Sequence, residues 1–250
     1  MKDLLWAVQG LWFFIDFCPM KILHKYSLLV SIFILAQSTC LARDHSMEDS
    51  IPSHANKTLF KTLTIPIYTF AGGSLIAITS AGRKLEENIR NGFDVNRKHT
   101  LVDDYTQYAP AALVFALDAA GMKGKYKPQQ QLLMYGLSVI GTAAVVQPMK
   151  RIIGRERPNS ADFRSFPSGH TSTAFAAAEF LNQEYGTQYP WISVAGYATA
   201  GLTGYLRMYN DQHWLGDVLA GAAIGMGTTK LIYWIREKTE QKKKRSFKIP

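Results

Sequence analysis

The sequence predicts an all-α protein, a bundle of about six helices. Uncharged or nearly uncharged runs of 12 to 21 residues recur along the chain, whereas the alternation of polar and apolar residues that marks β-strands is scarce. The runs are rich in Ala and Gly, and small residues allow helix backbones to approach one another closely. Turn-forming residues separate them, at Gly82, Gly121, Gly124, Pro128, Gly154, Pro158, Gly186 and Pro190.

The predicted helices follow one another from residue 62 to residue 235. The first, Thr62–Gly82, has 21 uncharged residues. The second, Tyr105–Met122, carries one charge, Asp118, which we interpret as a buried, hydrogen-bonded helix residue and not as a proton relay. The others are Leu132–Val146, the helix-forming run Thr171–Phe180, Gly186–Leu206, and Val218–Thr229 with its continuation Leu231–Ile235.

Residues 1–42 are predicted to be a signal peptide or an N-terminal anchor. A basic start at Met20 and Lys21 precedes the apolar stretch Ser27–Ala36, and Cys40-Leu41-Ala42 is a small-x-small site of the kind that a signal peptidase accepts. Translation starts at either Met1 or Met20. The chain has two cysteines, and both lie in this segment, so thiol chemistry is excluded from the mature part.

The charge balance favours anionic partners. The 250 residues include 28 basic and 19 acidic side chains, a formal net charge of +9. No basic groove interleaved with aromatic residues accompanies this charge, so we expect no nucleic-acid binding. The basic tail, residues 238–250, contains four consecutive cations, Lys242 to Arg245, which fit a solvated helix end or a cytoplasmic membrane flank.

Two apolar runs of about 20 residues approach the length that crosses a ~30 Å hydrocarbon layer. Their Thr, Ser, Gly and Ala content makes membrane insertion only weakly favourable. A membrane-embedded protein and a soluble protein of the cell envelope both remain open.

Three sequence blocks carry groups that bind and transfer phosphate. The third, Leu206–Asp217, contains His213 and Asp217 at the i,i+4 spacing that lets a carboxylate orient an imidazole. The second, Phe166–Ser172, reads FPSGHTS, a turn before a helix whose backbone N–H groups suit an anion. The first, Lys150–Pro158, adds basic residues. Together they supply a nucleophile, His213, a second histidine, His170, and the cations Lys150, Arg157 and Arg207.

This order of motifs, Lys-x6-Arg-Pro, Pro-Ser-Gly-His and Arg-x5-His-x3-Asp, resembles the type 2 phosphatidic acid phosphatase (PAP2) superfamily. That superfamily includes lipid phosphatases, non-specific acid phosphatases and vanadium haloperoxidases. The resemblance implies a PAP2-type helical phosphatase domain over residues 43–237. It also implies a metal-independent reaction without cofactor, through a phosphohistidine.

The resemblance assigns each residue a role. His213 would be the nucleophile, Asp217 its orienting partner and His170 the general acid for the leaving group. The phosphate oxygens would be bound by Lys150, Arg157, Ser168, Gly169 and Arg207. Two departures stand out: Leu206 replaces the serine that normally precedes the arginine, and the interval from Pro158 to Pro167 is short, which predicts an open site.

The expected substrate is a phosphorylated membrane lipid, of the isoprenyl pyrophosphate, phosphatidylglycerol phosphate or lipid A type. The alternative is a soluble periplasmic acid phosphatase; a vanadium haloperoxidase and a non-catalytic headgroup-binding protein are more distant alternatives. Tyr205, Tyr209 and Trp214 fit either a lipid site or ordinary packing. We expect the protein in the cell envelope, facing the periplasm. Lipid specificity, oligomeric state and a role for Asp103-Asp104 do not follow from the sequence.

Overall fold

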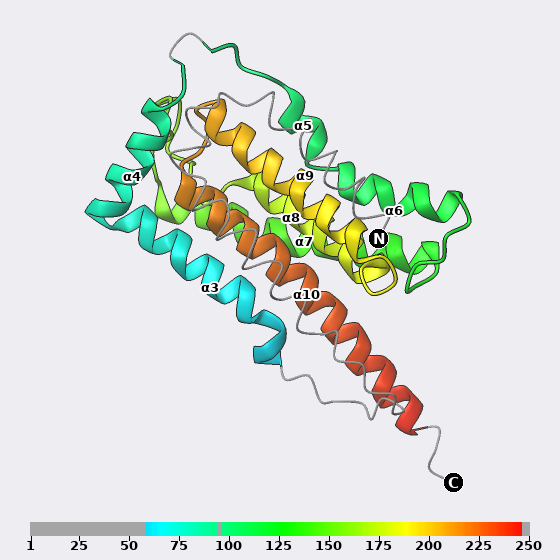
Figure 1. The fold of residues 1–250 in the computed structure, drawn as a ribbon. Coiled ribbons are helices and arrows are strands. Elements are labelled where there is room, and N and C mark those ends of the chain that lie inside the picture. Colours follow the sequence, from blue (N-terminus) through cyan, green and yellow to red (C-terminus); the bar gives the residue numbers. More distant parts are fainter. Residues whose placement is uncertain (1–58, 95–96, 247–250) are drawn as a thin grey trace. The chain divides into compact units, whose positions relative to one another are not determined.

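The computed structural model describes residues 59–94 and 97–246, and over these residues helices joined by loops are its regular secondary structure (Figure 1). The all-α prediction is therefore confirmed. The segment 1–42, predicted as a signal or anchor, lies outside the described residues. The eight described helices are α3 (Leu59–Ile78), α4 (Ser80–Asn91), α5 (Val102–Thr106), α6 (Ala109–Ala119), α7 (Pro128–Ile153), α8 (Gly169–Tyr185), α9 (Pro190–Tyr209) and α10 (Leu215–Ser246).

Two parts of the chain differ from the predicted pattern. The run Tyr105–Met122 is broken into α5 and α6, because Pro110 lies in the first turn of α6 and has no N–H to bond the carbonyl of Thr106, the last residue of α5. The polar helix α4 was not predicted. It starts at once after α3, where Thr79 caps it by accepting a hydrogen bond from the Gly82 amide at 3.1 Å. The turn is tight enough that a Cβ on Gly82 would lie 2.2 Å from the Ile76 carbonyl oxygen.

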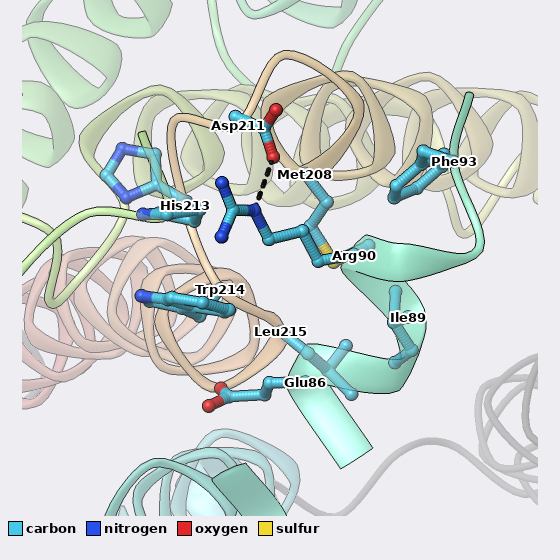
Figure 2. Close-up of a pocket in the computed structure, with 10 residues that line it drawn as sticks. Glu86, Ile89, Arg90, Phe93, Met208, Asp211, His213, Trp214 and Leu215 are labelled. Atoms are coloured by element: carbon cyan, nitrogen blue, oxygen red, sulfur yellow. Dashed lines mark hydrogen bonds and ion pairs between the residues drawn. The ribbon is translucent and has the colours of Figure 1, made fainter. Parts of the chain in front are cut away.

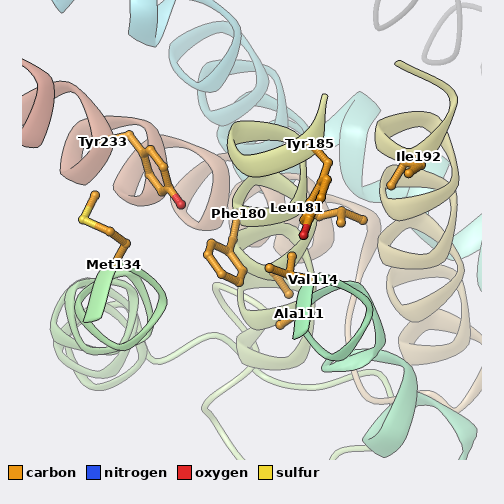
Figure 3. Packing of buried hydrophobic residues seen from close by; sticks show 9 residues of the cluster. Ala111, Val114, Met134, Phe180, Leu181, Tyr185, Ile192 and Tyr233 are labelled. Carbon is orange, nitrogen blue, oxygen red and sulfur yellow. The ribbon is translucent and has the colours of Figure 1, made fainter. Parts of the chain in front are cut away.

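Helix α8 forms the centre of the bundle. Its residues from Ala174 to Leu181 are buried on every side, as expected of a helix without a solvent face. It packs against α10, α9, α6 and α7. Figure 3 shows Phe180 and Leu181 of α8 among side chains of α6, α7 and α9. This core holds the helix whose first residues belong to the second phosphate block.

Close contact between α8 and α10 depends on glycine. A Cβ on Gly225 would lie 2.1 Å from the Ser172 carbonyl oxygen and 2.8 Å from the Ala176 nitrogen. Helix α3 runs antiparallel beside α10 (Figure 1), with Gly73 against Leu219 and Pro66 against Gly227. These contacts fix the start of α10 relative to the start of α8.

Three of the described helices are long and apolar enough to cross a membrane: Leu59–Ile78, Pro128–Ile153 and Leu215–Lys244. Large apolar side chains are exposed on the first two, among them Phe60, Ile78 and Ile140, each exposed by at least 67%. Helix α10 also continues past residue 237 through the basic block to Ser246, so these cations lie on the last turns of a helix.

Candidate active site

The three blocks meet at one end of the bundle. Lys150 is in the last turn of α7, and Ser168 is the N-cap of α8, directly before Gly169 and His170. Arg207 is in the last turn of α9, and Asp217 is in the first turn of α10. The fold thus brings together residues separated by up to 67 positions in the chain.

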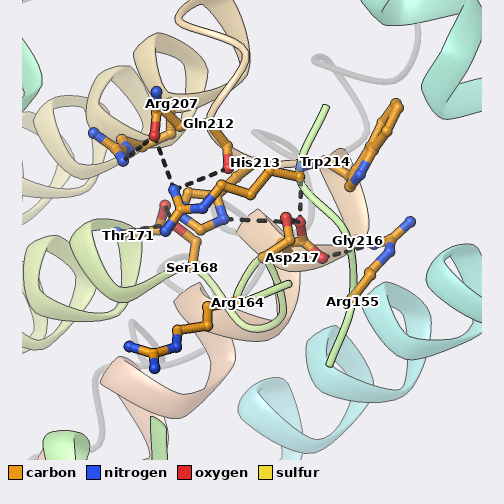
Figure 4. Close-up of polar contacts among 12 residues, drawn as sticks. Arg155, Arg164, Ser168, Thr171, Arg207, Gln212, His213, Trp214, Gly216 and Asp217 are labelled. Carbon is orange, nitrogen blue, oxygen red and sulfur yellow. Dashed lines mark hydrogen bonds and ion pairs between the residues drawn. The ribbon is translucent and has the colours of Figure 1, made fainter. Parts of the chain in front are cut away.

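Asp217 is fully buried and accepts hydrogen bonds on both carboxylate oxygens (Figure 4). Its donors are Arg155 Nη1 at 2.6 Å, the Trp214 amide at 2.8 Å and the Ser165 hydroxyl. A fourth neighbour, His213 Nδ1, lies 3.8 Å from Oδ2, which is longer than a hydrogen bond. Asp217 is therefore held rigidly by other groups while it faces the histidine.

His213 lies in the loop between α9 and α10, two residues before α10 begins, so the predicted pair spans a helix start and is not within a helix. The side chain is 2% exposed, and its Nδ1 has no hydrogen-bond partner. Burial, with the cations Lys150 and Arg207 nearby, lowers the pKa of His213 to about 4, against the opposing effect of Asp217. The imidazole is therefore neutral at neutral pH, the state that a nucleophile needs.

Arg157 and Arg207 share one hydrogen-bond acceptor, the side-chain oxygen of Gln212. Arg157 donates to Asp162 at 2.7 Å and to the side-chain oxygen of Gln212 at 2.8 Å. Arg207 donates to Asp103 at 2.6 Å and reaches the same Gln212 oxygen at 3.5 Å. Gln212 directly precedes His213 in the chain. Both guanidinium groups are thus fixed next to the histidine.

Lys150 completes the group of cations. Its Nζ donates to the Arg164 carbonyl at 2.7 Å, and the residue is 9% exposed. Lys150 lies close enough to Arg157 and Arg207 for their charges to act on it. Three cations from different parts of the fold repel one another, and an anion between them relieves that repulsion. The structure thus brings all three predicted phosphate-binding cations to one place.

The predicted anion cradle at the start of α8 has an unexpected feature. The Ser168 hydroxyl is 2.8 Å from the Thr171 hydroxyl and caps the helix, and the Ser168 amide donates to the Asp217 carbonyl oxygen at 2.9 Å. Ser168 is fully buried. By its position in the first turn, the amide of Gly169 has no partner within the helix. The cradle thus consists of this helix start beside Lys150, whose Cε is 3.7 Å from a Cβ placed on Gly169.

The second histidine is held by a residue that the sequence left unexplained. His170 Nε2 is 2.8 Å from Asp104 Oδ1 on α5. Burial and the charge of Arg207 lower the pKa of His170, against the opposing effect of Asp104. The neighbouring Asp103 is buried and binds Arg207 and, at 2.9 Å, Asn210. The pair Asp103-Asp104 therefore fixes one of the predicted phosphate-binding cations and one histidine.

The same three side chains, Asp103, Asp104 and His170, are also the group of potential metal ligands in the described part of the chain, with ligand atoms within 4.8 Å of one another. Both oxygens of Asp103 already accept hydrogen bonds from Arg207 and Asn210. Asp104 accepts one from His170 when the imidazole Nε2 is protonated. The donor set fits a hydrogen-bonded clamp better than a metal site.

Sequence reasoning missed Arg155, Glu86, Ser165 and Gln212. Arg155 lies two residues before Arg157, inside the first block, and that proximity was the available signal. Glu86 lies in the polar helix α4, and its partner Arg155 is 69 residues away in sequence. No local pattern reveals such a pairing.

The aromatic residues near the third block pack against other protein groups. Tyr205 and Tyr209 contact Phe93 edge to face, with ring centroids 5.9 and 5.7 Å apart. The centre of the Trp214 ring is 5.9 Å from the guanidinium group of Arg90 and 5.8 Å from that of Arg155. Figure 2 shows the hollow on this side of His213, which has room for about one water molecule. This hollow is too small for a lipid headgroup.

Comparisons with known proteins agree on one family. Residues 131–241 match the sequence model of the PAP2 superfamily. A lipid A 1-phosphatase of Porphyromonas gingivalis is 40% identical over 142 residues, which are 56% of this chain and 32% of that protein. A lipid A 1-phosphatase of Rhizobium etli is 33% identical over 105 residues, 35% of this chain and 43% of the relative. The chain thus spans less than half the length of the curated relatives it matches.

A solved structure shares the fold. The transmembrane PAP2 type phosphatidylglycerolphosphate phosphatase of Bacillus subtilis superimposes with a TM-score of 0.50 at 23% identity, over 72% of this chain and 97% of that one. At this identity the likeness concerns the arrangement of helices.

Proposed function

Because residues 131–241 match the sequence model of the PAP2 superfamily, we propose that this chain is a membrane-associated phosphatase that acts on phosphorylated lipids through a histidine nucleophile. The observation that carries the proposal is the buried His213–Asp217 pair, with three cations and a second histidine at the same end of the bundle. The names of the two relatives make the 1-phosphate of lipid A the first substrate to test.

In the proposed first step, neutral His213 attacks phosphorus through Nε2, because Nδ1 faces Asp217. The bond from phosphorus to the leaving oxygen breaks as the bond to Nε2 forms, and His170 gives its proton to that oxygen. Lys150, Arg157 and Arg207 neutralise the equatorial oxygens. The imidazole becomes positively charged, and we expect the 3.8 Å separation from Asp217 to shorten, as catalytic hydrogen bonds often do once substrate is bound.

In the second step, water attacks the phosphohistidine. His170, now neutral, accepts the water proton, inorganic phosphate leaves, and His213 returns to its neutral form. Both steps balance without a metal ion, because the three cations supply the positive charge.

The exposed apolar faces of α3 and α7 support insertion in a bilayer, where those side chains would face lipid. Helix α10 has the candidate active site at its first turn and exposed Lys242, Lys243 and Lys244 near its other end. Clustered lysines favour the cytoplasmic side of a membrane. We therefore place the site on the periplasmic face.

The decisive experiment measures phosphate release by purified protein in detergent with EDTA present. We expect lipid A 1-phosphate to be hydrolysed in preference to a soluble aryl phosphate, and His213→Ala to abolish turnover of both. A comparable rate on the aryl phosphate would favour the alternative of a broad acid phosphatase. Loss of activity in EDTA, or normal activity of the His213→Ala variant, would contradict the proposed chemistry.

A further inference from the structure

A chain of alternating charges lies directly behind Asp217. Arg155 bonds Asp217 Oδ1 through Nη1 at 2.6 Å and Glu86 Oε2 through Nη2 at 2.5 Å. The side chains of Asp217 and Glu86 are 0% and 1% exposed, and that of Arg155 is 16% exposed. Burying three ionisable groups costs much desolvation energy, and only well-aligned ion pairs and hydrogen bonds between them offset that cost.

Glu86 bonds the backbone at the start of α10 as well as the guanidinium of Arg155. Its Oε1 accepts a hydrogen bond from the Gly216 amide at 2.8 Å, in the first turn of α10. Arg155 in turn lies 5.8 Å from the centre of the Trp214 ring. Residues 214 and 216 lie on either side of the α10 start, immediately after His213. Helix α4 thus contacts the site through one buried carboxylate.

We propose that Glu86 and Arg155 are positioning residues for His213. They act by fixing the position and charge of Asp217, the carboxylate that faces this histidine. The inference rests on the function proposed above. The guanidinium of Arg155 partly offsets the negative charge of Asp217, and it would offset more of that charge if Asp217 were its only partner. Because Glu86 shares the guanidinium, Asp217 keeps charge available for the imidazolium that forms when His213 is phosphorylated.

Replacing each of the two residues by glutamine should change the pH dependence in a different way. The charged groups near His213 include Lys150 from α7, Arg157 from the loop after α7, Arg207 from α9 and Asp217 from α10, and Glu86, Arg90 and Asp211 line the hollow beside it. Removing the positive charge of Arg155 raises the pKa of His213, so the acid limb of kcat/KM, where His213 loses its proton, moves to higher pH. Burial raises the pKa of Glu86, so the wild-type carboxyl takes up a proton as the pH falls toward that limb, and Glu86→Gln should lower the rate most at neutral pH. A residue that served packing alone would lower the rate by the same factor at every pH.

The first test compares Glu86→Gln with Glu87→Gln, its exposed neighbour on α4. Both changes remove one charge at nearly constant shape. For Glu86→Gln we expect kcat to fall roughly ten- to a hundredfold, the range seen for residues that orient a metal ligand without touching the metal, with little change in KM. We expect this loss to shrink as the pH falls through the raised pKa of Glu86, because the wild-type carboxyl is protonated there as well. Glu87→Gln should behave as wild type.

The second test replaces Arg155 by Gln and by Lys, with Arg151→Gln, an exposed arginine at the end of α7, as the control. Lysine keeps the charge but cannot bond both carboxylates as a fork, so Arg155→Lys should restore the acid limb and only part of kcat. Thermal unfolding of each variant in detergent identifies any that does not fold; Glu86→Gln then carries the test.

Two results would overturn the inference while leaving the proposed function in place. One is identical pH profiles and kcat for Glu86→Gln and Glu87→Gln, in a protein that His213→Ala inactivates. The other is loss of activity in Glu86→Gln in proportion to lost folded protein, by the same factor at every pH. Activity that survives His213→Ala would instead contradict the function itself.

Discussion

The imidazole of His213 is subject to burial, two cations and one carboxylate, and burial has the largest effect on its protonation. With the pKa of His213 lowered to about 4, the proposed nucleophile stays neutral well below pH 6.5, the ordinary value for histidine. His170, the proposed acid, must be protonated, and its pKa is also below the ordinary value.

These two directions predict an acidic optimum. kcat/KM should rise with pH as His213 loses its proton near pH 4 and fall as His170 loses its proton, below about pH 6.5. The measurement is kcat/KM from pH 3 to pH 9 on a substrate whose own phosphate ionisation is known. A rate that keeps rising above pH 7 would contradict the assignment of both histidines.

The role of His170 predicts a dependence on the leaving group. His170→Ala should slow an alkyl phosphate roughly 10²- to 10⁴-fold, the usual contribution of a general acid. The loss should be much smaller for a nitrophenyl phosphate, whose leaving group needs no proton. The comparison is the ratio of the two rates in His170→Ala and in His99→Ala, an exposed histidine. An equal loss on both substrates would rule out proton donation.

Among the helices, the contact of α8 with α10 has the strictest spatial requirement. Gly225→Ala places a methyl group against the backbone of α8 at Ser172 and Ala176, and neither atom can move without shifting that helix. We expect a loss of about 1–3 kcal/mol of stability, the usual cost of overpacking. Reduced activity should accompany it, because α8 carries His170 and α10 carries Asp217.

The matched control is Gly201→Ala in α9, where nothing lies within 4 Å of the added Cβ. That change should be neutral or stabilising by up to about 1 kcal/mol, because alanine favours a helix more than glycine does. Thermal unfolding in detergent compares the two. Equal melting temperatures for both variants would show that α8 and α10 can move apart to accommodate a methyl group at little cost in stability.

The helices also show what the sequence could and could not predict. The long apolar runs became α3, α7, α9 and α10, because their length and composition leave no other way to satisfy the backbone. Asp118 is hydrogen-bonded, to the Tyr185 hydroxyl at 2.6 Å, although it is half-buried and not fully buried. Helix α4 was not predicted, because its polar sequence lacks a long apolar run and nothing in it marks Glu86 as buried.

The site residues divide in the same way. His170, His213, Asp217 and the three cations lie in short motifs that can be read locally, and the fold brings them together. The clamps around them come from distant segments: Asp103 bonds Arg207 across 104 residues, and Asp104 bonds His170 across 66. Such pairings are created by packing and leave no local pattern.

At the scale of the whole molecule, the proposed placement predicts opposite exposure of its two ends. With Cys18 and Cys40 replaced by serine, Phe163→Cys, 65% exposed in the loop before α8, should react with a membrane-impermeant maleimide applied to the periplasm. Lys243→Cys, exposed near the end of α10, should react only after the inner membrane is opened. The reverse pattern would put the site in the cytoplasm.

The length of α10 has a consequence for which molecules can be substrates. Its 32 residues extend about 48 Å, slightly more than the ~40–45 Å of a bilayer with its headgroups. In the proposed membrane placement, His213 lies two residues before the first turn of α10, so the length of this helix would set the distance of the proposed reaction from the membrane midplane. Phosphates would then be selected by their distance from the membrane before any chemical recognition. Those at the headgroup plane would reach His213, and those carried farther into the water would not.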